Sequence, residues 1–187
     1  YHPRPSDPTV FSYHNIHSCK FLNNIETALG YLVGGPSSKC LGILGAGQID
    51  PCGNANSTKI PGAAYLVGSG GANDVAATSQ ESMVVMNAGK ERLLAKVPYT
   101  TFPGEKIRTL VTDVGVFEKI EDEPDFTLTA YIPSDEKKSK AESLLSIQDK
   151  VGWKLKIAPE PERIGPPTKN ELTLLRLFDP RGFFIGA

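Results

Sequence analysis

The segment Gly68–Gly71 has the residue types that a loop needs to hold an anionic oxygen. It follows a short apolar run and holds three glycines in four residues. Glycine lets the backbone turn sharply and approach a ligand closely, so successive N–H groups can surround an oxyanion, a phosphate or a thioester carbonyl. A helix that begins at Asn73 or Asp74 would add its dipole to that field. A tight structural turn explains the same glycines equally well.

An earlier glycine segment, Gly45–Gly47, suggests dinucleotide binding but does not meet its requirements. The dinucleotide motif places glycines as G-x-G-x-x-G, and here the sixth position is Asp50, followed directly by Pro51. A phosphate-binding P-loop is excluded as well, because the chain has no G-x-x-x-x-G-K-[ST] sequence. Neither nucleotide motif is therefore present.

The polar turn 48–57 is a second candidate for ligand binding. Its neutral hydrogen-bonding side chains are those of Gln48, Asn54 and Asn56. They follow an apolar strand, and ligands of open α/β sheets bind outside the carboxyl ends of strands. The alternative is that the asparagines bond to their own backbone in Asx-turns.

The carboxylates and nucleophiles give weaker signals. Asp50, Asp74 and Asp113 follow strands, and each is better explained as a turn-former or helix cap. No serine stands in a G-x-S-x-G sequence, and no Cys–His pair has the spacing of a catalytic dyad. The sequence therefore assigns no catalytic residue.

Metal binding and disulfides are not expected. His2, His14 and His17 all lie within the first seventeen residues, and no other cluster supplies a third ligand. The three cysteines, an odd number, are interpreted as small buried apolar side chains in a reducing, cytoplasmic compartment; they are Cys19, Cys40 and Cys52.

The composition excludes several classes of protein. The chain has 187 residues and a formal net charge of −1, which fits one domain and argues against general nucleic-acid binding. No stretch is long and apolar enough to span a bilayer. The opening residues lack both an initiator Met and the apolar core of a signal peptide, so we expect a fragment or a processed product.

Periodicity and turn signals predict three helices and about eight strands. The helices are Phe21–Val33, one that opens at Ser134 or Asp135, and Thr168–Phe178 with a Thr168–Glu171 capping box; a further helix could begin at Asn73. Buried strands are predicted at Cys40–Leu44 and Met83–Met86, and other strands at Ala64–Val67, Leu93–Val97 and Ile107–Thr112. Val114–Ile120 and Thr127–Ile132 are predicted to form a hairpin. Trp153–Ile157 is predicted to be an edge strand, and the proline-rich segment Pro159–Pro167 a connector.

These elements predict an α/β fold with an open, mostly parallel and largely buried sheet that is flanked by helices. Residues 1–20 are expected to form an irregular N-terminal segment, and residues 21–187 one α/β domain.

The order of the motifs resembles family I CoA-transferase β subunits, in the branch of the glutaconate and 3-oxoadipate CoA-transferases. The family has a G-x-x-Q-V/I-D…G-N-x-N turn and then a G-x-G-G-A-x-D loop. The chain matches these with Gly45–Asp50, Gly53–Asn56 and Gly68–Asp74. Further on, Val111–Phe117, Gly152–Leu155 and Asp179–Gly182 resemble later family segments.

The resemblance implies a fold of the CoA-transferase or NagB/RpiA-like type and a site between an α-type and a β-type half. In such enzymes a glutamate attacks an acyl-CoA thioester, and coenzyme A passes to a second carboxylic acid. Coenzyme A is then a substrate, with no permanently bound cofactor, in a cytoplasmic hetero-oligomer. The residues expected to line the CoA and acyl site are Gly68, Ser69, Gly70, Gly71, Ala72, Asn73, Gln48, Asn54 and Asn56.

One departure concerns the nucleophile. The family carries its glutamate upstream of the G-x-x-Q turn, and the only glutamate before Gln48 is Glu26, within a helical pattern. We therefore expect the nucleophile on an upstream segment and an isolated chain without activity. Two alternatives stay open: a CoA-ester hydrolase or lyase of the same fold without a glutamyl intermediate, and a non-catalytic CoA-binding subunit.

Overall fold

The computed structural model describes residues 13, 16, 19, 21–180 and 182. The chain divides into two compact units, Ile25–Ile164 and a second unit made of Tyr1–Asn24 and Gly165–Ala187. His2, His14, His17 and Arg181 lie outside the described residues. The predicted boundary between residues 20 and 21 stays a prediction.

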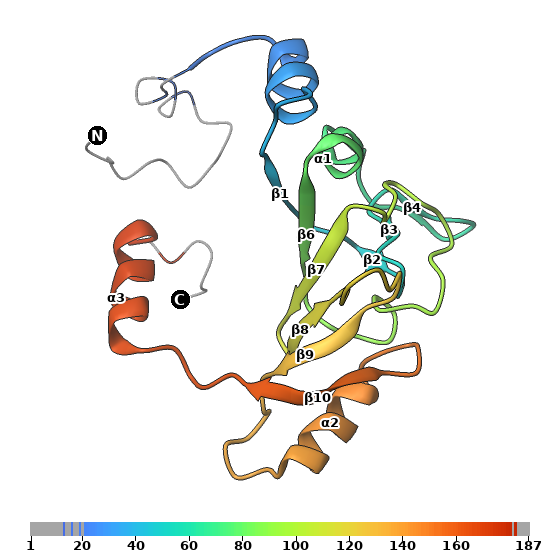
Figure 1. The fold of residues 1–187 in the computed structure, drawn as a ribbon, viewed down its shortest axis with the longest axis vertical. Coiled ribbons are helices and arrows are strands. Elements are labelled where there is room, and N and C mark those ends of the chain that lie inside the picture. Colours follow the sequence, from blue (N-terminus) through green and yellow to red (C-terminus); the bar gives the residue numbers. More distant parts are fainter. Residues whose placement is uncertain (1–12, 14–15, 17–18, 20, 181, 183–187) are drawn as a thin grey trace. The chain divides into compact units, whose positions relative to one another are not determined.

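A six-stranded sheet forms the centre of the larger unit (Figure 1), in the spatial order β1-β6-β7-β8-β9-β10. β1 pairs with β6, β6 with β7, and β9 with β10 in parallel, whereas β8 is antiparallel to both of its neighbours. The sheet is thus mixed and mostly parallel, which confirms the predicted α/β class. Its strands are β1 (Leu41–Leu44), β6 (Glu81–Val85), β7 (Ile107–Thr112), β8 (Gly115–Glu118), β9 (Thr127–Tyr131) and β10 (Lys156–Arg163).

One row of side chains crosses four strands and forms the centre of the core. Val84 pairs with Leu110, Leu110 with Phe117, and Phe117 with Leu128, and all four are fully buried. Burial of each such side chain stabilises the fold by about 1.5–3 kcal/mol. The core also takes in buried side chains outside this sheet: Ile49, Ala55, Leu93 and Phe102.

The prediction that Cys40–Leu44 and Met83–Met86 are buried strands is wrong for one face of the sheet. The side chain of Ile43 is 65% exposed and that of Val85 48% exposed. β1 is an edge strand, and in β6 the buried Ser82 and Val84 alternate with residues that are not fully buried. A short continuous apolar run does not distinguish a strand buried on one face from a strand buried on both.

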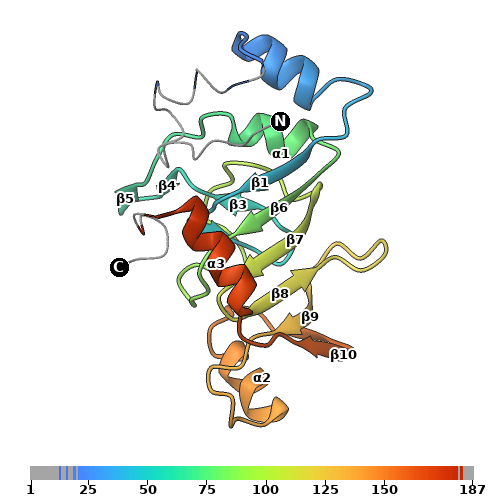
Figure 2. The ribbon, with the colours of Figure 1, turned by 90° about the vertical axis from the view of Figure 1, so that its left-hand side faces the viewer.

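Two helices accompany the sheet near β1 (Figure 2). The helix η2 (Glu26–Val33) is a wide coil of the π type and covers the second part of the predicted helix Phe21–Val33. The helix α1 (Ala72–Thr78) is close to the predicted position, contacts β1 and β6, and buries Ala76.

The third helix of the larger unit begins later than predicted. α2 (Lys140–Gln148) has Ser139 as its N-cap, in a reciprocal capping box with Glu142. The prediction of Ser134 or Asp135 as the cap is therefore wrong. Asp135 instead accepts a hydrogen bond from the Lys137 backbone N–H at 2.9 Å, an Asx-turn that competes with helix formation.

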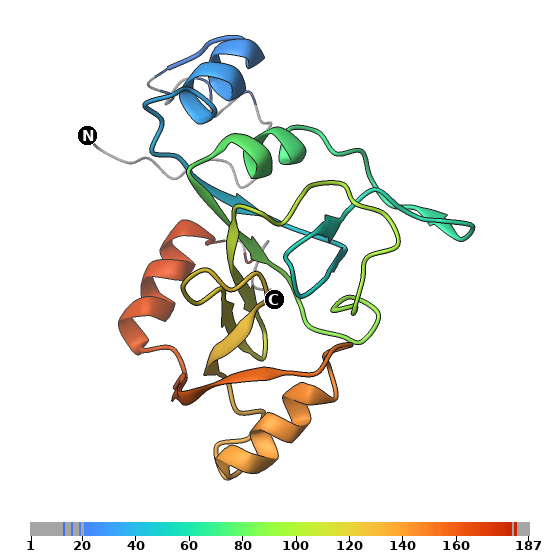
Figure 3. The same cartoon turned by 45° about the vertical axis from the view of Figure 1, so that its right-hand side comes forward.

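Two short hairpins lie outside the main sheet (Figure 3). β2 (Gln48–Ile49) pairs with β3 (Ala55–Asn56), and β4 (Lys59–Ile60) pairs with β5 (Ala64–Tyr65). The predicted strand 64–67 is thus shorter than expected. The prediction of a strand at Leu93–Val97 is wrong, because this segment makes only an isolated bridge from Leu93 to Ile49.

The last strand extends into the predicted connector. β10 is an edge strand, as predicted, but it begins at Lys156 and reaches Arg163, so the first part of Pro159–Pro167 is strand. Its register shifts between Ile157 and Glu162, and an edge position with a bulge is where a strand tolerates proline.

The second unit contains the helix α3 (Lys169–Phe178). Its N-cap is Thr168, in the predicted capping box with Glu171. None of the helices in the described part of the chain is long and apolar enough to cross a membrane.

Candidate functional site

The loops that leave the parallel strands β1, β6 and β7 are tied to one another. Arg92, on the segment after β6, donates hydrogen bonds to the carbonyls of Ala46 at 3.1 Å and Gly47 at 3.3 Å, both directly after β1. Asp113, directly after β7, accepts a hydrogen bond from the Ala88 N–H at 2.6 Å. The carboxyl edge of the sheet is therefore a connected set of loops.

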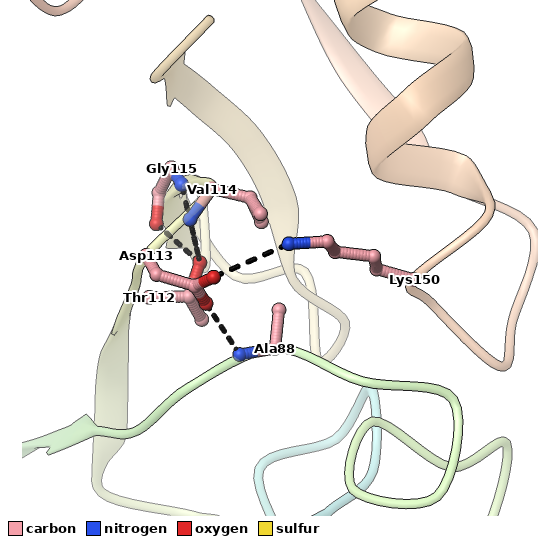
Figure 4. Close-up of polar contacts among 6 residues, drawn as sticks. All are labelled: Ala88, Thr112, Asp113, Val114, Gly115 and Lys150. Atoms are coloured by element: carbon pink, nitrogen blue, oxygen red, sulfur yellow. Dashed lines mark hydrogen bonds and ion pairs between the residues drawn. The ribbon is translucent and has the colours of Figure 1, made fainter. Parts of the chain in front are cut away.

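Asp113 is held by charge as well as by hydrogen bonds (Figure 4). Its second oxygen is 3.3 Å from the Lys150 ammonium. Burial acts to raise the pKa of Asp113, but the Ala88 N–H and Lys150 outweigh this and lower the pKa below its usual value. In the same turn, Thr112 donates to the Gly115 carbonyl at 2.8 Å. The structure agrees with the interpretation of Asp113 as a turn residue.

The amides of Gln48 and Asn56 form one buried network. The Asn56 Nδ2 donates to the Gln48 Oε1 at 2.9 Å and to the Lys59 carbonyl at 2.8 Å. The Asn56 Oδ1 accepts the backbone N–H groups of Thr58 at 3.0 Å and Lys59 at 3.3 Å. The Gln48 Nε2 donates to the Glu91 carbonyl at 3.1 Å. These amides hold two hairpins in place.

Asn54 serves the neighbouring turn. Its backbone and its side-chain amide both donate to Asp50, and its Oδ1 accepts the Gly104 N–H at 3.1 Å. The structure thus brings Gln48 and Asn56 together and gives Asn54 a separate set of partners. The prediction that these three line a CoA site stays a prediction, while their hydrogen bonds within the chain are structural.

The glycine loop has a different character. Gly70 has a φ of +53°, in the region that favours glycine. The N–H of Ala72 donates to the Ser69 carbonyl at 3.0 Å. The backbone N–H groups of Gly70 and Gly71 have no acceptor among the residues that the structure describes. The Oδ1 of Asn73 is buried and also lacks a partner within that part of the chain.

The helix after this loop contributes little field of its own. α1 has only seven residues and no side-chain cap, so its dipole is small. The loop packs instead against η2, because a Cβ at Gly71 would lie 3.0 Å from the Leu29 Cδ1. No hydrogen bond among the described residues joins this loop to the amides of Gln48, Asn54 or Asn56.

An open pocket beside the β4–β5 hairpin is a feature that the sequence did not reveal. Its volume is about 630 Å³, and the Lys59 ammonium lies 4.7 Å from the centre of the Tyr99 ring. Tyr99 is 40 positions from Lys59 and lies in a segment without periodicity. No repeated pairing of aromatic and basic residues in the sequence marks these two as partners. The lining residues are Lys59, Ile60, Pro61, Gly62, Ala63, Ala64, Tyr65 and Tyr99.

The cysteines are free, and none of the three is fully buried, since Cys40 is half-buried. Cys19 and Cys52 are exposed, which corrects the interpretation of all three as small buried apolar side chains. Cys52 donates to the Asp125 carboxylate at 3.3 Å; partial burial, and then Asp125, raise its pKa above the usual value. Among the described residues, no three potential metal ligands gather at one place.

Comparison with known proteins gives a consistent set of relatives. No family model matches the chain. The chain is 28% identical to the B subunit of glutaconate CoA-transferase from Acidaminococcus fermentans over 80% of its length, and 24% identical to the B subunit of 3-oxoadipate CoA-transferase from Pseudomonas knackmussii over 75%. The crystal structure of the A. fermentans enzyme matches 79% of the chain and 61% of its own, with a TM-score of 0.66 and 28% identity.

The chain is a homologue of family I CoA-transferase B subunits. It spans about 60% of the length of the curated relatives it matches. The decarboxylase AibA/AibB shares the fold, with a TM-score of 0.79 over 98% of this chain and 76% of that chain at 19% identity. As a CoA-transferase homologue, the chain combines a shared α/β fold with a glycine loop whose Gly70 and Gly71 N–H groups have no acceptor in the described part of the chain.

Proposed function

We propose that this chain is the B-type part of a CoA-transferase, which moves coenzyme A from an acyl-CoA to a carboxylic acid. The observation that carries the proposal is the loop Gly68–Gly71, in which the N–H groups of Gly70 and Gly71 have no acceptor among the described residues. Such donors can stabilise the oxyanion that develops when a thioester carbonyl is attacked. The homology to the B subunits of two transferases supports the same conclusion.

The reaction proceeds through a carboxylate nucleophile. A glutamate oxygen adds to the thioester carbonyl and the C–S bond breaks. The CoA thiolate departs, and an acyl–glutamyl anhydride remains on the enzyme. The thiolate then attacks the glutamyl carbonyl, which releases the first acid and forms a glutamyl-CoA thioester. The second acid reverses these two steps and leaves as the new acyl-CoA. The residues proposed to line the site are those of the glycine loop, Gly68 to Asn73, while Gln48, Asn54 and Asn56 are proposed to lie beside it, in the turn that their hydrogen bonds hold in place.

The chain is proposed to act with a partner. Its relatives are B subunits by name, so we expect an A-type partner in a hetero-oligomer and no activity from the isolated chain. The nucleophilic glutamate is expected on an upstream segment that is not part of this sequence, since Glu26 is exposed on η2 rather than in a glycine turn. A cytoplasmic location is proposed from the free cysteines.

Mass spectrometry tests the covalent step. The protein assembled with its A-type partner is incubated with acyl-CoA and treated with borohydride or hydroxylamine, and peptides are searched for a modified glutamate. A modified glutamate together with CoA transfer supports the proposal. Full turnover without a modified glutamate would instead indicate a hydrolase or lyase, and CoA binding without any turnover would indicate a non-catalytic subunit.

A further inference from the structure

We propose that Arg92 binds a second carboxylate of the acid substrate, one that takes no part in the transfer, so that the preferred acids carry two carboxylates. This inference rests on the proposed function and names the substrate class of the same site. Of the four arginines that the structure describes, only Arg92 is half-buried, whereas Arg108, Arg163 and Arg176 are exposed. Removing a charge from water costs free energy unless a partner compensates it.

Two hydrogen bonds fix the guanidinium group of Arg92. Its Nε donates to the Gly47 carbonyl at 3.3 Å, and its Nη2 donates to the Ala46 carbonyl at 3.1 Å. Both acceptors are neutral, so they do not compensate the positive charge. The remaining nitrogen, Nη1, has no acceptor among the residues that the structure describes. The chain therefore orients the guanidinium group and leaves one of its nitrogens available to a ligand.

Arg92 has no carboxylate partner in the described part of the chain. The adjacent acid, Glu91, turns its carboxylate toward Gly89, since a Cβ added to Gly89 would meet the Glu91 Oε1. Elsewhere at the carboxyl edge of the sheet, the Lys150 ammonium lies 3.3 Å from Asp113 (Figure 4). The charge of Lys150 is thus compensated within the chain, and the charge of Arg92 is not.

The place of Arg92 is the one where open α/β sheets bind their ligands. Ala46 and Gly47 directly follow β1, and the segment of Arg92 follows β6, which pairs with β1 in parallel. Ligands of such sheets bind outside the carboxyl ends of the strands. The approach is open at this point, because Gly45 is exposed and a Cβ added there would meet no atom within 4 Å.

The glycine loop lies at the same edge as Arg92. Directly after α1, the N–H of Gln80 donates to the carbonyl of Cys40 at 3.1 Å, at the amino end of β1. Further back in α1, Val75 lies beside Gly42, in the middle part of β1. α1 therefore runs from the carboxyl edge toward the amino edge, and the glycine loop before it is at the carboxyl edge. A substrate whose thioester carbonyl is bound by this loop can extend along the edge to Arg92.

The guanidinium group selects the kind of anion. Its planar N–H groups match the two oxygens of a carboxylate and also those of a phosphate. One guanidinium balances the single charge of a carboxylate, whereas a phosphate monoester carries a charge of about −2. Arg92 is the single half-buried arginine in the described part of the chain, so the carboxylate is the better match. The phosphates of coenzyme A are the competing source of an anion.

Transfer to matched pairs of acids tests the inference. The full chain, assembled with its A-type partner, is assayed with acetyl-CoA as the donor. The acceptors are diacids and monoacids of equal carbon number: succinate and butyrate, glutarate and valerate, adipate and hexanoate. We expect the best acceptor to be a diacid, with a kcat/KM about 10- to 100-fold above that of its matched monoacid. A monoacid as the best acceptor overturns the inference and leaves the proposed function standing, whereas transfer to none of the six acids contradicts the proposed function.

Two substitutions separate binding of the acid from support of the loops. Arg92→Gln keeps a donor for the carbonyls after β1 but removes the charge, and should lower kcat/KM for the best diacid about 10- to 100-fold, with the matched monoacid unaffected. Arg92→Lys keeps the charge and should lose less. An equal loss with both acids would show that Arg92 only supports the loops. The matched control is Arg176→Gln, at an exposed position on α3, which should keep the wild-type preference.

Two further measurements identify the anion. At saturating acid, Arg92→Gln should keep the wild-type KM for acetyl-CoA. A rise in this KM with an unchanged preference among acids would mean that Arg92 binds a phosphate of coenzyme A, which overturns the inference. Calorimetry needs no turnover: the best diacid should bind the wild-type assembly at least about 10-fold more tightly than the Arg92→Gln assembly, and equal binding to both contradicts the assignment.

Discussion

The turn 48–56 and the loop 68–71 are both rich in turn residues, and the structure uses them in opposite ways. In the turn, the amides of Gln48, Asn54 and Asn56 all bond within the chain. In the loop, the N–H groups of Gly70 and Gly71 remain without acceptors among the described residues. The turn is therefore built for rigidity, and the loop is available to a ligand.

This difference shows that a motif rich in polar and turn residues can serve either the fold or a ligand. An amide whose donors and acceptors are all used inside the chain supports a site without contacting its ligand. A loop that leaves donors unused has the capacity to bind. The following predictions test whether the turn and the loop differ in this way.

The largest expected effect on stability comes from the buried amide of the turn. Asn56→Ala leaves the Gln48 Oε1, the Lys59 carbonyl and two backbone N–H groups without their partner. We expect a loss of about 3 kcal/mol in the free energy of unfolding, measured by urea denaturation. The matched control Asn87→Ala, at an exposed position, should change it by less than about 0.5 kcal/mol. Equal effects of the two variants would contradict the structural role of Asn56.

A smaller effect is expected at the start of α2. Ser139 is engaged in a capping box, whereas Ser134 contacts only an exposed Lys138 ammonium at 2.9 Å. Ser139→Ala should cost about 1 kcal/mol of stability, and Ser134→Ala should have almost no effect. Thermal unfolding of both variants gives the comparison. A larger loss of stability for Ser134→Ala than for Ser139→Ala would support a helix that begins at Ser134.

Asp113 gives a still smaller effect that depends on pH. Its pKa is lowered in the folded chain, so its contribution to stability is present above the unfolded pKa of about 3.9 and is lost as the pH falls through the folded value. Because the side chain is more than a third exposed, Asp113→Asn should cost only about 0.5 kcal/mol at pH 7. Urea unfolding near pH 2 should show no difference from the wild type, and a cost that persists there would exclude the charge as its cause.

The smallest effect on stability is expected in the loop. The Ser69 hydroxyl makes only a long contact of 3.5 Å with the Gly70 carbonyl. Ser69→Ala should therefore change the free energy of unfolding by less than about 0.5 kcal/mol. A loss comparable to that of Asn56→Ala would show that the loop is as structural as the turn.

The sequence predicts the elements whose signals are local. The strand Ile107–Thr112 has the predicted bounds, and the capping box of Thr168 with Glu171 forms as expected. The hairpin of β8 and β9 also matches, because its acidic turn and its strands are adjacent in the chain. The capping box and the hairpin join parts of the chain that are close in sequence. The apolar residues of Ile107–Thr112 lie in the strand itself, although the strand also pairs with β6.

Features that depend on distant partners could not be predicted. The Asn54 side chain bonds to Gly104 and the Lys59 side chain lies over Tyr99. No motif around Gly104 or Tyr99 identifies either residue as the partner of a distant side chain. The exposure of Ile43 follows from the edge position of β1, which no property of the strand itself reveals. The glycine loop could be found, since its residue types alone allow its geometry.

The most direct test of the central claim is the rate of CoA transfer by Gly71→Val, assembled with the A-type partner. The added side chain would meet Leu29 and displace the N–H groups of the loop. Loss of one oxyanion donor typically lowers kcat by 100-fold or more, so we expect at least about a 100-fold loss with an unfolding transition close to that of the wild type. Gly165→Val, at a position with open space, should retain full activity. A Gly71→Val assembly that transfers CoA at the wild-type rate would contradict the account.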